Sequence, residues 1–181
     1  NGSLTVAEPN TLSPLGGDPL LAQMFNPMHL VEQPRYLNKS AWIEHVPFAM
    51  WLMEALKPRV FTELGTHYGV SYFAFCQAAI RAEIGCRCYA IDTWVGDSHA
   101  GSYGEEVYKT VRRHNEEFYS AFSRLVRSTF DEARPYFADN SIDLLHIDGL
   151  HTYTAVKHDF ETWLPKLTRR GVVVFHDNNV R

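Results

Sequence analysis

Five short apolar segments alternate with longer segments of helical periodicity, and this alternation constrains the fold more than any other feature of the chain. The apolar segments cover residues 59–64, 86–92, 123–130, 142–148 and 172–177, and the helical segments cover 42–56, 71–84, 105–119, 131–137 and 152–167. A helix between two strands returns the chain to the same edge of a sheet, which makes the strands parallel and the crossovers right-handed. The sequence therefore predicts an open, doubly wound α/β sheet.

The first part of the chain differs from the rest in composition. Residues 1–38 hold five of the nine prolines and show little periodicity. We expect an extended N-terminal arm over 1–38, followed by one folded domain over 39–181.

Charge and hydropathy exclude several classes of partner. The net charge of -4 gives no long-range attraction to nucleic acid or to anionic membranes. No run of 18 apolar residues occurs, and the first residues lack the pattern of a secretion signal. The three cysteines, Cys76, Cys86 and Cys88, complete no zinc site and are expected to be reduced core thiols. We therefore expect a cytoplasmic protein that acts on a small molecule, without nucleic-acid or membrane partners.

Acidic residues stand at the ends of the first two apolar segments, where a doubly wound sheet binds its ligands. Glu63 ends the first, and Gly65 and Gly69 follow it. The glycines allow close approach of a ligand, and the helix that begins near Ser71 favours a carboxylate. Asp92 ends the second, where a carboxylate typically binds ribose hydroxyls. The anionic Glu63 suits a ligand that also carries a cation. A molecule with a cation, a ribose and a carboxylate matches S-adenosylmethionine.

A dinucleotide would require another pattern. The nicotinamide fingerprint needs glycine at position 67, which is histidine here. The sequence thus argues against a nicotinamide oxidoreductase.

The motifs resemble those of a known family. The segments are "ELGTHYGVS", "AIDTWVGDSHAGSYGEEVY", "LLHIDGLHTYTAVKHDFETW" and "GVVVFHDNN". They are similar to class I S-adenosylmethionine-dependent methyltransferases of the family-24 type, which is often found with bacterial glycan-modifying enzymes. The resemblance covers roughly residues 40–181 and implies a Rossmann-like, mainly parallel sheet.

The resemblance also implies cofactor-binding residues. Glu63, Gly65, Thr66 and Gly69 would line the methionine end, and Ser71 would bond the carboxylate. Asp92 would hold the ribose and Trp94 would lie near the adenine, with Ser128 and Thr129 at the adenine edge.

Metal-dependent O-methyltransferases of similar sequence place a metal-binding acid after the fourth strand and a base three residues later. That pattern maps onto Asp148 and His151, with Asp177 and Asn178 as further metal ligands. A cation lowers the pKa of a bound oxygen, and oxygen ligands suit Mg²⁺. The resemblance leaves open whether Mg²⁺ is required. It implies O-methylation of a small molecule or of a sugar or glycan.

Other interpretations stay open. His151 is a base, a donor to substrate, or a structural cap. His146 is expected in the core. His176 is either a ligand or, as we rather expect, a residue that orients Asp177 or the adjoining loop. The polar loop 92–104 is a lid, an acceptor-recognition segment or a surface turn. The chain as a whole is a methyltransferase, a catalytically silent binding module, or, least in keeping with Glu63 and Asp92, a metal-dependent hydrolase.

Class I methyltransferases usually add an antiparallel hairpin after the fifth strand, whereas this sequence stops at Arg181. An exposed edge strand tends to pair with another chain. We therefore expect either a hairpin outside the given segment or a strand-mediated homodimer.

Overall fold

The computed structural model describes residues 33–97 and 101–176. Five strands form one parallel sheet: β1 (Val60–Leu64), β2 (Arg87–Asp92), β5 (Ser123–Arg127), β6 (Ile142–Ile147) and β7 (Leu167–Phe175). Their order is β5-β2-β1-β6-β7. The chain moves from β1 outward through β2 to β5, then crosses to β6 on the other side of β1. The predicted doubly wound sheet is confirmed, and its change of direction lies between β1 and β6.

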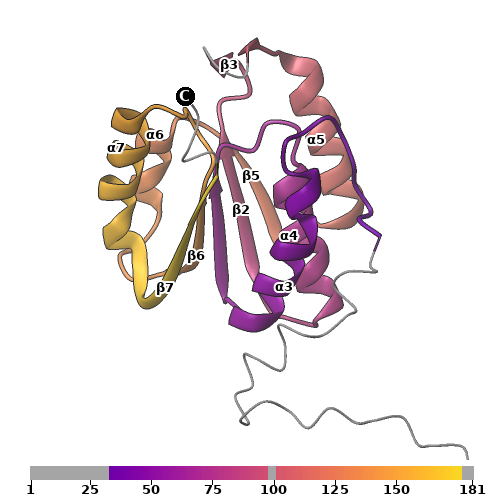
Figure 1. Cartoon of the computed structure of the whole chain (residues 1–181), viewed down its shortest axis with the longest axis horizontal. Coiled ribbons are helices and arrows are strands. Elements are labelled where there is room, and N and C mark those ends of the chain that lie inside the picture. Colours follow the sequence, from indigo (N-terminus) through magenta and orange to yellow (C-terminus); the bar gives the residue numbers. More distant parts are fainter. Residues whose placement is uncertain (1–32, 98–100, 177–181) are drawn as a thin grey trace, which may run out of the picture.

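Helices cover both faces of the sheet (Figure 1). One face carries α3 (Val46–Leu56), α4 (Val70–Arg81) and α5 (Glu105–Phe118), with the 3-10 turn η1 (Ile43–His45) before α3. The other carries α6 (Phe130–Ala133) and α7 (Tyr153–Trp163), each followed by a 3-10 turn, η2 (Arg134–Tyr136) and η3 (Leu164–Lys166). In the described part of the chain, no helix is long and apolar enough to cross a membrane.

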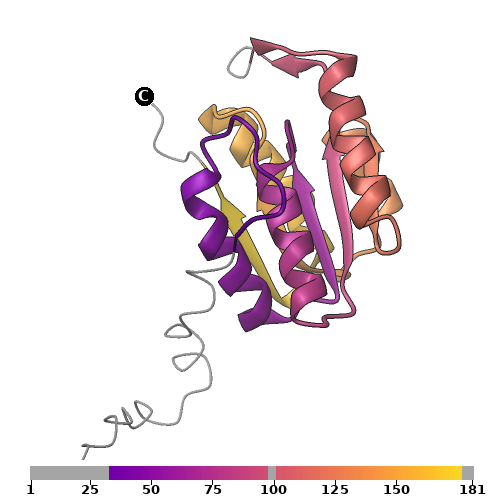
Figure 2. The same cartoon turned by 90° about the vertical axis from the view of Figure 1, so that its right-hand side faces the viewer.

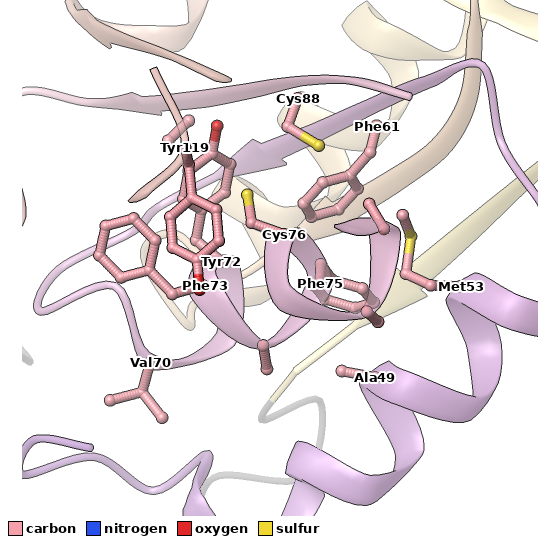
Figure 3. Packing of buried hydrophobic residues seen from close by; sticks show 14 of the residues in the cluster. Ala49, Met53, Phe61, Val70, Tyr72, Phe73, Phe75, Cys76, Cys88 and Tyr119 are labelled. Carbon is pink, nitrogen blue, oxygen red and sulfur yellow. The ribbon is translucent and has the colours of Figure 1, made fainter. Parts of the chain in front are cut away.

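The central strands β1 and β6 are buried on both faces, which explains their largely apolar sequences, whereas the edge strands β5 and β7 are partly exposed. The core under α3, α4 and α5 is the larger, and Figure 3 shows Phe61, Phe75 and Met53 packed within it. The second core lies under α6 and α7 around Trp163. Cys76, Cys86 and Cys88 are all buried and free, as predicted.

Three segments differ from the sequence-based prediction. The third strand ends at Arg127 rather than at 130, because the Thr129 side chain accepts the Glu132 N–H and begins α6. The fifth strand begins earlier than predicted, at Leu167. The polar loop contains an antiparallel hairpin of β3 (Gly96–Asp97) and β4 (Gly101–Ser102).

Candidate functional site

A cavity of about 950 Å³ opens at the carboxyl end of the sheet. The loops after β1, β2, β5, β6 and β7 line it, together with residues 39–42. Eight of the residues predicted from the sequence contribute to the lining: Gly65, Thr66, Gly69, Ser71, Asp92, Thr129, Asp148 and His151. A smaller hollow of about 450 Å³ lies at the opposite end of the sheet and contains none of them.

The loop after β1 passes very close to the loop after β6. A Cβ atom on Gly65 would lie 2.1 Å from the carbonyl oxygen of Asp148, and φ at Gly65 is +89°. Gly69 has φ +83° and is the N-cap of α4. Both positions require glycine, because an L side chain is strained at such φ values and Gly65 also lacks room for one.

Asp92 holds this loop in place. Its Oδ2 accepts the backbone N–H groups of Thr66 and His67 at 2.8 and 2.9 Å, and its Oδ1 accepts that of Trp94 at 2.7 Å. Oδ1 accepts one of these three bonds, so this oxygen keeps capacity for a ligand hydroxyl. Asp92 therefore organises the cavity wall besides lining it.

Trp94, which the resemblance placed near the adenine, is buried behind the cavity wall. Its ring is fully buried, its Nε1 donates to the His67 carbonyl at 3.0 Å, and it packs 5.0 Å from the Tyr108 ring. It does not contribute to the cavity lining. The indole thus supports the loops from behind. Ser128 is also outside the lining, where its N–H donates to the Asp92 carbonyl at 3.0 Å.

Glu63 faces the core instead of the cavity. Its Oε2 lies 2.7 Å from Nδ1 of His146, its register partner across β1 and β6, and both side chains are fully buried. Burial raises the pKa of Glu63, although the hydrogen bond from His146 opposes that rise. The expected core location of His146 is confirmed. The resemblance placed Glu63 beside the ligand. In this structure Glu63 would act on a ligand indirectly, through neighbours such as Ser71, which lines the cavity.

Asp148 and two histidines form a chain at the cavity wall. Nδ1 of His176 lies 3.1 Å from Asp148 Oδ1, and Nε2 of His151 lies 3.7 Å from the same oxygen. Burial raises the pKa of Asp148. The hydrogen bond from His176 and the nearby His146 and His151 lower that pKa by more than burial raises it, so the pKa lies below its usual value. His176 was expected to orient Asp177 or the adjoining loop; Asp177 lies outside the described residues, and the structure shows the contact of His176 with Asp148.

The predicted metal ligands are only partly described. Asp177 and Asn178 lie outside the described residues. Among residues 33–97 and 101–176, no group of three or more His, Cys, Asp or Glu side chains is arranged to hold a metal ion.

Aromatic residues complete the wall on the side of the hairpin. The His67 ring lies 4.4 Å from both Tyr68 and Tyr103, and the Tyr103 hydroxyl lies 3.5 Å from Asp92 Oδ2. Phe130, at the start of α6, also lines the cavity. The sequence pointed to the polar loop 92–104 as part of the site. It did not predict these contacts, because they join segments that are distant in sequence.

Comparison with known proteins places the chain in context. The sequence model of a family described as "Methyltransferase domain" (Methyltransf_24) matches residues 62–178. The protein y4gI of Sinorhizobium fredii, described as uncharacterized, is 53% identical over 166 residues, which are 89% of this chain and 18% of that protein. The chain thus spans less than a fifth of that relative's length.

Solved structures share the fold. The cofactor-bound Rv0187 from MTB superposes with a TM-score of 0.58 at 21% identity, covering 89% of this chain and 66% of that one. The O-methyltransferase TomG from Streptomyces achromogenes, in complex with S-adenosylmethionine, gives 0.59 at 15% identity, covering 87% and 65%. These likenesses confirm the predicted Rossmann-like fold.

Proposed function

The chain belongs to the Methyltransf_24 family of methyltransferase domains, and on that premise we propose that it transfers the methyl group of S-adenosylmethionine to a hydroxyl oxygen of a small molecule or sugar. The observation that carries the proposal is the shared cavity. Asp92 and the Gly65–Gly69 loop line it together with Asp148 and His151. A cofactor site and a proton-accepting group thus face the same space.

The donors and acceptors of the cavity fit this cofactor. Asp92 and Asp148 bring two carboxylates to the lining, which suits a cationic sulfonium. The buried Thr66 Oγ1 has no hydrogen-bond partner among the described residues, so a ligand could satisfy it. Asp92 would bind the ribose, the Gly65–Gly69 loop the methionine part, and Thr129 and Phe130 the adenine edge.

His151 is the proposed base. S-adenosylmethionine supplies a methyl carbon activated by its sulfonium, and the oxygen that attacks it must lose a proton. His151 would accept that proton, and Asp148, 3.7 Å away, would stabilise the resulting imidazolium. His176 holds the same carboxylate oxygen of Asp148, at 3.1 Å. This arrangement supports His151 as base over a purely structural cap.

We further propose that the reaction uses Mg²⁺. Asp148 would be one ligand, and Asp177 and Asn178 the others. Activity that survives prolonged dialysis against EDTA would remove the metal from the mechanism.

The test is methyl transfer from labelled S-adenosylmethionine to a panel of deoxysugars, glycan fragments and small alcohols. His151→Ala should lower kcat about 10²- to 10⁴-fold while leaving the Kd for S-adenosylmethionine unchanged. His158→Ala is the matched control, because His158 is exposed, pairs with Asp131 and does not line the cavity. Full activity of His151→Ala would rule out the base. Cofactor binding without transfer to any acceptor would favour the silent binding module.

A further inference from the structure

Residues 33–42, called the strap from here on, run across the helices to the rim of the cavity. The Arg35 N–H donates to Gln77 Oε1 at 2.7 Å, and Gln77 Nε2 donates to the Gln33 carbonyl at 3.0 Å. The Tyr36 ring packs 4.9 Å from Phe73. Figure 2 shows the strap, in indigo, lying over α4. The strap is therefore anchored before it reaches the cavity.

The end of the strap forms the wall beside the proposed acceptor site. Residues 39–42 all contribute to the cavity lining. Trp42 is only 3% exposed, and its ring lies 5.5 Å from the ring of His176, which bonds Asp148. The wall that the strap builds is thus next to the Asp148 and His151 pair, where an acceptor hydroxyl would have to lie.

Lys39 gives this wall a positive charge that no carboxylate of the described residues pairs with directly. Within the described part of the chain, Lys39 is the sole lysine or arginine in the lining, and its side chain has no ion-pair partner there. The two lining carboxylates already have close partners, Asp92 with backbone N–H groups and Asp148 with His176. A cation beside a sulfonium cofactor is unfavourable unless an anion lies between or beside them.

We propose that the acceptor carries an anionic group, a carboxylate or a phosphate, and that Lys39 binds it while the acceptor hydroxyl faces His151. This inference rests on the proposed function and names its substrate class. The lysine ammonium is a compact charge on a flexible stem and can serve either anion. Binding through it would weaken as salt is added, because the residue is exposed.

The experiment is calorimetric titration of the protein saturated with S-adenosylhomocysteine. The probes are glucuronate, glucose 6-phosphate and glucose, which share a sugar ring and differ in charge. At least one anionic sugar should bind ten times more tightly than glucose, and comparing the two identifies the anion. Lys39→Ala should abolish the preference and Lys39→Arg should keep most of it. Lys109→Ala, an exposed lysine on α5 outside the lining, should change nothing.

Each outcome decides the matter. Equal affinity for the three sugars, no sugar binding, or a preference that survives Lys39→Ala would overturn the inference while leaving the proposed function in place. A loss of S-adenosylhomocysteine affinity in Lys39→Ala would also overturn it, since Lys39 would then bind the cofactor carboxylate. Failure of the unaltered protein to bind S-adenosylhomocysteine would instead refute the proposed function, and the inference with it.

Discussion

Nδ1 of His146 lies 2.7 Å from Oε2 of Glu63, and neither side chain is exposed to solvent. The pair joins the two strands between which the sheet changes direction, one row below Asp148. Removing one member of a buried hydrogen-bonded pair leaves the other member buried without its partner. The pair therefore stabilises the contact between the two central strands, β1 and β6.

Glu63→Ala should lower the free energy of unfolding by about 3–5 kcal/mol, because His146 would keep a buried polar ring without its partner. Urea denaturation measures the loss. The double variant Glu63→Ala with His146→Ala should lose less than the sum of the two single variants. Additive losses, or a loss below about 1 kcal/mol for Glu63→Ala, would contradict this account of the pair.

Gly65→Ala should strongly destabilise the fold, since its Cβ would lie 2.1 Å from the Asp148 carbonyl oxygen at a φ of +89°. Strain of this kind costs about 1–3 kcal/mol before the clash is counted. Gly85→Ala is the control, because nothing lies within 4 Å of its added Cβ. Its effect should stay within about 1 kcal/mol. Similar melting temperatures for the two variants would refute the close approach of the two loops.

Asp92→Asn should weaken S-adenosylmethionine binding by tenfold or more. The amide would replace one oxygen of a carboxylate that accepts three backbone N–H groups, and bonds to a charged acceptor contribute about 1.5–3 kcal/mol each. Calorimetric titration gives the Kd. Asp139→Asn, an exposed residue paired with Lys166, should leave that Kd within twofold. An unchanged Kd in Asp92→Asn would remove this residue from the cofactor site.

The free energy of unfolding should depend on pH because the pKa of Asp159 is shifted. Burial raises the pKa of Asp159 to about 6 from its ordinary 3.8. The folded state therefore binds the Asp159 proton more tightly than the unfolded state does. This binding stabilises the fold at low pH, and that contribution to the free energy of unfolding is lost as pH rises from about 4 to about 6. Asp159→Asn, which mimics the protonated form, should be more stable than the unaltered protein above pH 6. The difference should vanish below pH 4 in thermal melts, and a difference independent of pH would contradict the shift.

The order of strands and helices followed from the sequence because apolar runs and helical periodicity are local signals. The directions of individual side chains did not. Glu63 and Trp94 stand beside the strand ends, yet register with His146 and the bond to the His67 carbonyl draw both into the core. Contacts between distant loops decide such directions, and one sequence does not contain them.

His176 is a further residue whose contacts could not be predicted from the sequence. Its position at the end of β7 was visible, but its partner depended on the spacing between β6 and β7, which includes a register shift between Ile142 and Leu144. Asp148 and His151 were found more easily, because three residues in one loop keep them close in any fold of this class. Local spacing therefore keeps Asp148 and His151 together, while long-range register brings His176 to the same carboxylate.

A crystal structure of the protein with S-adenosylhomocysteine tests the central claim most directly. The account predicts that the ribose hydroxyls contact Asp92 and that the sulfur faces the part of the cavity that Asp148 and His151 line. A ligand bound at the smaller hollow near Arg59, or one whose sulfur faces away from His151, would contradict it.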